Sequence, residues 1–73
     1  MLSGKKLTFE AKTIVDDVAI ARFFAVLRLD DNKLDLNTNY LDGAACQEHR
    51  DVVRADQEEF ENFVYQVQDS LNQ

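Results

Sequence analysis

Few residues in this chain have the chemistry of a catalytic or metal site. Cys46 and His49 are three positions apart, so on a helix they could share one side, as a cysteine nucleophile and its base require. Such a pair also needs an activating environment and a pocket, and neighbouring helical turns often bring these residue types together without function. A zinc site takes about four ligands, whereas the chain has one cysteine and one histidine. We therefore expect no catalytic residue and no metal site.

Two further patterns of ligand-bearing residues also fail. The turn from Asp30 begins like a calcium loop, but Leu34 stands where an oxygen ligand belongs. Asp35 replaces the turn glycine, and Leu41 replaces the closing glutamate. The chain has two glycines and no glycine-rich phosphate loop. We expect no cofactor and no small-molecule ligand.

The composition is typical of a small folded domain. We expect one domain over residues 1–73, because 45% of the side chains are apolar and no linker or repeat is visible. The longest apolar run, Phe23 to Leu27, is too short to cross a bilayer. The single cysteine fits a reducing compartment, and the N-terminal residues lack the apolar run of a signal peptide. The expected location is the cytoplasm.

The formal net charge is −6, which limits the partners. An acidic protein has no electrostatic reason to bind nucleic acid directly or to bind an anionic membrane. The three N-terminal lysines, Lys5, Lys6 and Lys12, are too few for a nucleic-acid patch. Neutral or basic protein surfaces are the natural partners, although an acidic balance also serves solubility alone.

Alternation of apolar and polar residues predicts strands near 6–14, 18–29 and 33–40, with turns at Asp16-Asp17 and after Asp30. The middle segment is decided by Arg22 and Arg28. On a helix these arginines would point about 120° apart and would leave no apolar stripe, whereas on a strand they share one face. The opposite face of that strand is then wholly apolar: Ala19, Ala21, Phe23, Ala25, Leu27 and Leu29.

Charges and apolar residues together predict the two hairpin registers. A four-residue loop would place Leu29 opposite Leu34 and Arg28 opposite Asp35, an attractive cross-strand pair. In the first hairpin, a three-residue loop over 15–17 is expected to bring together two further pairs. These are Phe9 with Phe23 on the core face and Glu10 with Arg22 on the other face.

No helix breaker occurs from Ala44 to Leu71, and one apolar stripe recurs at helical spacing: Phe60, Phe63, Val64, Val67 and Leu71. A helix is expected over at least 57–70. Either residues 44–71 form one long helix, or a short first segment precedes a helix that starts at Asp56 as its candidate cap. Residues 44–55 remain open between helix, short strand and loop. The expected fold is α+β, a three-stranded antiparallel meander over about 6–40 with a C-terminal helix, within a helical region 44–71, packed on one face. The expected core side chains are Phe23, Leu27, Leu36, Phe60, Val64 and Val67.

The candidate functional surface is the second face of the middle strand. One helix covers only one face of a sheet, so apolar residues on the other face lack cover. Either they form an association surface, or residues 42–54 fold back over them, or they are ordinary exposed apolar surface. The candidate interaction residues are Val18, Ile20, Arg22, Phe24 and Val26.

A resemblance points the same way. Several residues in the second half of the chain resemble short proteins encoded by phages and prophages of Gram-positive bacteria. They are Lys33-Leu34-Asp35-Leu36-Asn37, Tyr40, Val53-Arg54-Ala55-Asp56 and Phe60. The resemblance implies a small accessory protein that acts by binding.

Three function classes follow. We expect a non-enzymatic interaction module that binds itself or another protein, self-associating through the outer sheet face. The alternative is an acidic inhibitor that mimics nucleic acid and blocks the groove of a nucleic-acid-binding enzyme. Its carriers would be Asp51, Glu58, Glu61 and Asp69 on one side of the helix. An enzyme is the least favoured class.

Overall fold

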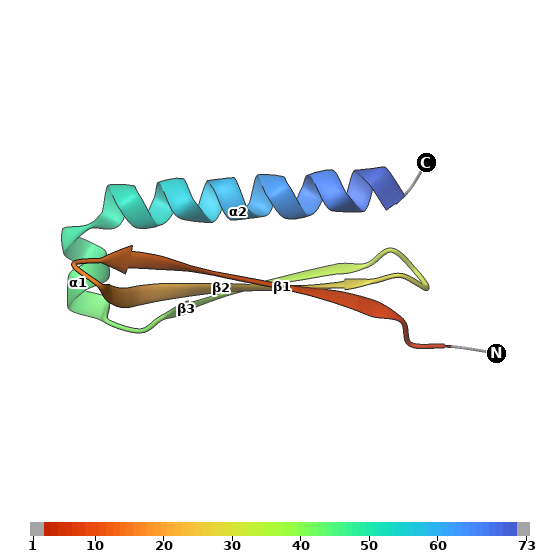
Figure 1. Cartoon of the computed structure of the whole chain (residues 1–73), viewed down its shortest axis with the longest axis horizontal. Helices are drawn as coiled ribbons and strands as arrows, with labels where there is room; N and C mark the ends of the chain where they lie inside the picture. The colour runs from red at the N-terminus through yellow and green to blue at the C-terminus, as the bar shows by residue number, and fades with distance from the viewer. Residues whose placement is uncertain (1–2, 72–73) are drawn as a thin grey trace.

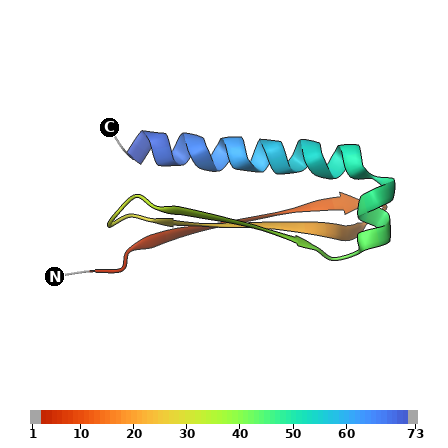
Figure 2. The same cartoon turned by 180° about the vertical axis from the view of Figure 1, so that it is seen from behind.

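The structure is a computed structural model that describes residues 3–71 as a sheet layer and a helical layer (Figures 1 and 2). The elements are β1 (Lys6–Val15), β2 (Val18–Arg28), β3 (Leu34–Tyr40), α1 (Gly43–Glu48) and α2 (Arg50–Leu71). The strands form one antiparallel sheet in the order β1-β2-β3, and α2 runs along one of its faces. The expected α+β fold with a C-terminal helix packed on one face is confirmed, and each strand boundary agrees within one residue.

The first hairpin closes more tightly than expected. Val15 pairs with Val18, so the loop is Asp16-Asp17 alone, with φ angles of 51° and 65°. Two successive positive φ values make a type I′ turn, whose twist matches that of the strands. The expected three-residue loop and its pairs were therefore wrong, since Phe9 lies opposite Ala25 and Glu10 opposite Phe24.

A β-bulge keeps the apolar faces aligned in spite of this short loop. The register shifts between Thr13 and Ile14, which pair with Ala21 and Ala19 and leave Ile20 as the extra residue of β2. Without the extra residue, the two-residue loop would set Phe9 opposite Phe24 and bring the core face of one strand beside the outer face of the other. The bulge adds one position, so Phe9 and Phe23 share the helix-side face.

The second hairpin is also displaced from the expected register. Leu27 pairs with Leu34 and Val26 with Asp35, so the expected Arg28–Asp35 pair does not form. The backbone N–H of Arg28 instead donates to the carbonyl of Lys33 at 2.8 Å, beyond the last pair of the ladder. The shift is two residues, which preserves the faces because side chains alternate with a period of two.

The open question about residues 44–55 is resolved as two helices. Asp42 caps α1, because its Oδ1 accepts a hydrogen bond from the backbone N–H of Ala45 at 3.1 Å. The chain then breaks at His49 and α2 begins at Arg50, so the helical region is not one long helix, and Asp56 lies inside α2 instead of capping it. Within the described residues, neither helix combines the length and the apolar character needed to cross a membrane.

The core lies between α2 and the first two strands. Phe23, Leu27, Phe60 and Val64 are buried as expected, and the rings of Phe23 and Phe60 stack with centroids 5.8 Å apart. The small residues Ala21 and Ala25 are fully buried beside Phe23 on the same face of β2 and leave space for these rings.

Two expected core residues are not buried. Leu36 is 37% exposed and Val67 is half-buried. The physical reason is the position of α2, which contacts mainly β1 and β2 and leaves β3 largely uncovered. For the same reason Tyr40, on the helix-side face of β3, stays exposed.

Candidate functional site

The open face of the sheet carries most of the residues expected from the sequence. Arg22 is exposed, and Phe24 and Val26 are half-buried along the centre of β2. Val18 does not belong to this face, and its expected place was wrong. The bulge sets it opposite Val15 on the helix-side face, where it is exposed at the turn end of β2. Among residues 3–71, no element covers the open face, because α2 lies on the other side of the sheet and α1 at its end (Figure 1).

Ile20 does not belong to this surface, and its expected place was wrong. The bulge turns its side chain into the core, where it is 2% exposed in one cluster with Cys46 and Val53. Its carbonyl accepts hydrogen bonds from the backbone N–H groups of Leu41 and Asp42, at 2.9 and 3.2 Å. Ile20 therefore joins the sheet to the start of α1.

Charged side chains surround Phe24 and Val26 on the open face. Nη2 of Arg22 donates a hydrogen bond to Oε2 of Glu10 at 2.8 Å, and Nζ of Lys12 lies 4.0 Å from Oε1 of Glu10. By the observed register this face holds four basic residues against two acidic ones. The basic residues are Lys6, Lys12, Arg22 and Arg28, and the acidic residues are Glu10 and Asp35.

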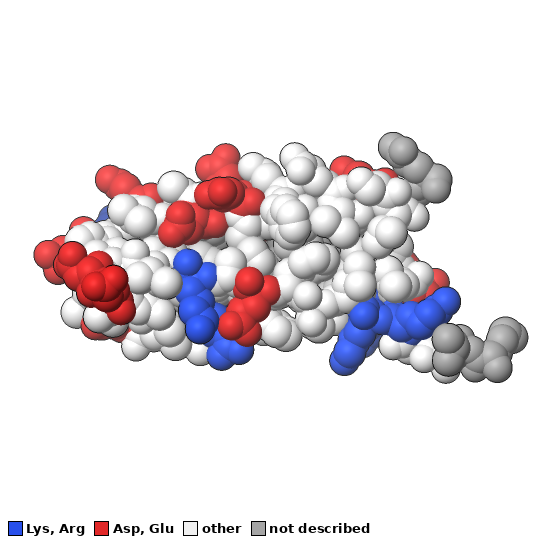
Figure 3. Space-filling model, in the orientation of Figure 1, with Lys and Arg blue, Asp and Glu red and all other residues white. Residues whose placement is uncertain are grey.

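The net charge of the protein lies in the other layer. Residues 41–73 hold eight acids against two arginines, which alone accounts for the formal charge of −6, while residues 1–40 balance at zero. Figure 3 shows Asp and Glu gathered over the helical layer and at the left end, whereas most Lys and Arg on that side lie over the sheet. The molecule therefore has a basic open sheet face and an acidic helical layer.

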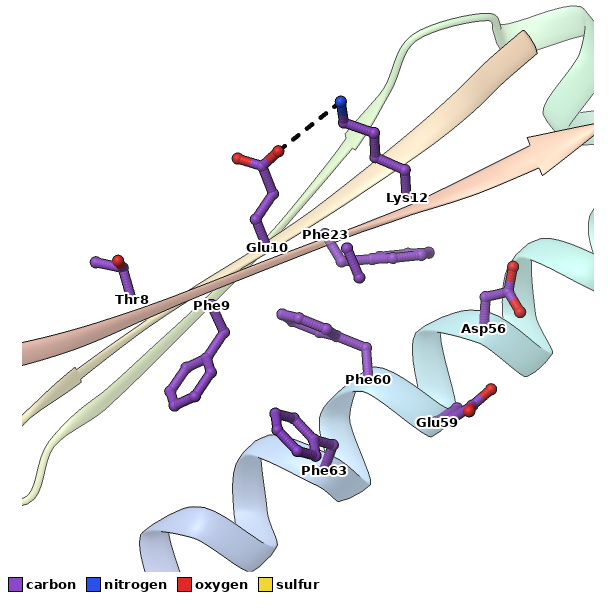
Figure 4. A pocket seen from close by; sticks show the side chains of 10 residues that line it. Thr8, Phe9, Glu10, Lys12, Phe23, Asp56, Glu59, Phe60 and Phe63 are labelled. Atoms are coloured by element: carbon purple, nitrogen blue, oxygen red, sulfur yellow. Dashed lines mark ion pairs between the residues drawn. The ribbon is translucent and has the colours of Figure 1, made fainter. Parts of the chain in front are cut away.

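A second site, missed by sequence reasoning, is an aromatic cleft of about 570 Å³ between β1 and α2. Figure 4 shows the rings of Phe9, Phe60 and Phe63 facing one another there, with Asp56 and Glu59 on the helix side. Phe63 is 52% exposed and meets Phe9 edge to face, with centroids 5.8 Å apart. The spacing of Phe60 and Phe63 was visible in the sequence, but their position beside β1 was not.

Asp56, which lines the cleft, also accepts a hydrogen bond that links β1 to α2. The buried hydroxyl of Thr13 donates to Oδ2 of Asp56 at 2.7 Å. Asp56 thus lies inside α2 and holds the helix to β1, and it is not the helix cap that the sequence suggested.

The residues with potential chemistry take structural roles. Cys46 is buried, and its Sγ donates to the carbonyl of Ile20 at 3.1 Å, while His49 ends α1. Asp30 accepts a hydrogen bond from the N–H of Gly4 at 2.7 Å, and Asp31 accepts one from Lys33 at 3.2 Å. Across residues 3–71, His, Cys, Asp and Glu side chains form no cluster of three or more that could hold a metal ion.

Comparison with known proteins adds no relative to these observations. No family model, curated protein or solved structure matches the chain.

Proposed function

We propose that the chain is a small non-enzymatic protein-interaction module that docks through the open face of its sheet. The observation that carries this proposal is the half-buried pair Phe24 and Val26 at the centre of an uncovered face, ringed by charged side chains. An apolar centre with a polar rim is the usual anatomy of a protein interface.

The charge of the open face favours a partner with acidic groups. Four basic residues stand there against two acidic ones, so two copies stacked face to face would bring like charges together. Another protein with an acidic surface fits better than a second copy at this face. The resemblance to short phage and prophage proteins implies the same kind of role, an accessory protein that acts by binding.

The test replaces Phe24, which lies outside the core cluster. Phe24→Asp should abolish capture of a partner from the native host while its thermal melt stays cooperative. Val52→Asp, at an exposed position on α2, is the matched control and should keep the partner. If Phe24→Asp captures the same proteins as the wild type, the open face is not the docking surface.

One observation supports a second candidate, the acidic nucleic-acid mimic. The whole net charge of −6 arises from residues 41–73, where exposed acids such as Asp51, Glu58 and Asp69 follow α2. A basic nucleic-acid-binding groove would accept such a surface. The discriminating measurement is competition between this protein and DNA for a nucleic-acid-binding enzyme of the host. Glu58→Lys should weaken that competition and leave the capture tested with Phe24→Asp unchanged.

A further inference from the structure

The free edge of β1 is the longest unpaired strand edge of the sheet, at ten residues. On the β2 side, the carbonyl of Lys5 accepts a hydrogen bond from the N–H of Leu29 at 2.9 Å. Backbone groups alternate sides along an antiparallel strand, so even-numbered residues from Lys6 to Lys12 turn their N–H and C=O groups to the free edge. An edge of this kind is a template for another strand.

We propose that β1 pairs antiparallel with β1 of a second copy, with Ala11 opposite the partner's Ala11. In this register Glu10 faces the partner's Lys12, and Lys12 faces the partner's Glu10. Beyond the paired strands, the partner's turn brings Asp16 and Asp17 toward Lys6 and Lys5. Figure 3 shows this pattern, because acidic and basic side chains alternate from left to right along the lower layer. A two-fold axis reverses the residue order in the partner strand, so that acidic side chains of one copy meet basic side chains of the other.

Neighbouring registers fail on charge. Centring the pair on Glu10 or on Lys12 places that residue opposite its own copy, with like charges in contact. Centring it on Phe9 sets Lys12 against the partner's Lys6, and centring it on Thr13 brings Glu10 to the partner's turn, next to Asp16. In the remaining registers the two-fold axis passes between two residues. Each residue that turns its backbone groups to the free edge would then face a residue whose backbone groups are already bonded to β2. Ala11 is therefore the centre that the charges and the hydrogen bonds both accept.

The apolar side of the edge fits the same register. Phe9 would face the partner's Thr13, and Leu7 the partner's Val15, all on the helix-side face. Because α2 contacts β1 and β2 to a similar extent, we place its axis midway between these strands, about half a strand spacing inside β1. The two α2 axes would then run ~10 Å apart, within the usual helix-packing distance. The exposed ring of Phe63, at the open side of the aromatic cleft, would lie in the seam between the helices.

The first experiment exchanges charges and measures association by sedimentation equilibrium of the full chain. Glu10→Lys alone and Lys12→Glu alone should each weaken the dimer roughly tenfold, because each sets like charges opposite at two symmetric places. An equimolar mixture of the two variants should restore the affinity, since every pair then joins lysine to glutamate. Mixing cannot repair damage within one chain, such as loss of the Glu10–Arg22 hydrogen bond, so this recovery reports contact between copies.

The second experiment reads the register directly. In a Cys46→Ser background, Ala11→Cys should oxidise to a disulfide-linked dimer, because the two positions face each other across the axis. Thr8→Cys, on the same strand, should not, because six residues separate the two copies of position 8. Phe24→Asp, which tests the open face, should leave the dimer intact, so the two proposals fail separately. A monomeric wild type, no recovery on mixing, or dimer loss in Phe24→Asp would each overturn the β1 edge as the contact between copies.

Discussion

Thr13 offers a sharp test of how the helix is held on the sheet. Its side chain is fully buried, and its hydroxyl donates a 2.7 Å hydrogen bond to the half-buried carboxylate of Asp56. A hydrogen bond to a charged group contributes about 1.5–3 kcal/mol, and water can replace part of it at a half-buried acceptor. Valine matches the shape of threonine and opens no cavity. We expect Thr13→Val to lower the free energy of unfolding by about 1–2 kcal/mol, and the melting temperature by roughly 4–16 °C.

The measurement is a double-mutant cycle by urea and thermal denaturation, with Thr13→Val, Asp56→Ala and the double variant. The cycle is needed because Asp56→Ala also gains up to about 0.7 kcal/mol of helix propensity. The coupling between the two sites should be about 1–2 kcal/mol. Thr8→Val, at an exposed threonine of the same strand, is the control and should stay within about 0.5 kcal/mol of the wild type. A coupling near zero would refute the reasoning, because apolar contacts alone would then hold α2 in place.

Three further outcomes are expected from denaturation of single variants. Phe60→Ala should cost about 3–5 kcal/mol, because the ring is buried and stacked on Phe23, whereas Phe63→Ala should cost no more than about 1.5 kcal/mol for its exposed ring. Equal costs would contradict the assignment of Phe60 to the core. Asp17→Gly should stabilise the protein by about 0.5–1 kcal/mol, because Asp17 has a φ of 65° that glycine adopts without steric cost; a loss of stability would argue against the type I′ turn. Cys46→Ser should cost about 1–2 kcal/mol, and the wild-type thiol should react with a thiol reagent only slowly, since Cys46 is buried; immediate reaction would contradict that burial.

Local patterns in the sequence were enough to predict the elements of this fold. Alternation identified the strands, and the parity of Arg22 and Arg28 showed that residues 18–29 form a strand with one wholly apolar face. The stripe from Phe60 to Leu71 identified the long helix. These predictions succeeded because side-chain periodicity follows from backbone geometry within a single element. The apolar and charged positions of β2 were likewise readable, so Phe24 and Val26 were placed on the open face.

The relations between elements were decided by the tertiary structure. The registers of both hairpins differed from expectation by two residues, because turn type and the bulge at Ile20 set the pairing, and a shift of two leaves the alternation unchanged. The same bulge moved Ile20 from the expected surface into the core. The position of α2 over β1 and β2 left Leu36 exposed and brought Phe63 beside Phe9 to form the aromatic cleft. Residues far apart in the chain make these contacts, and no local periodicity encodes which strand a helix will cover.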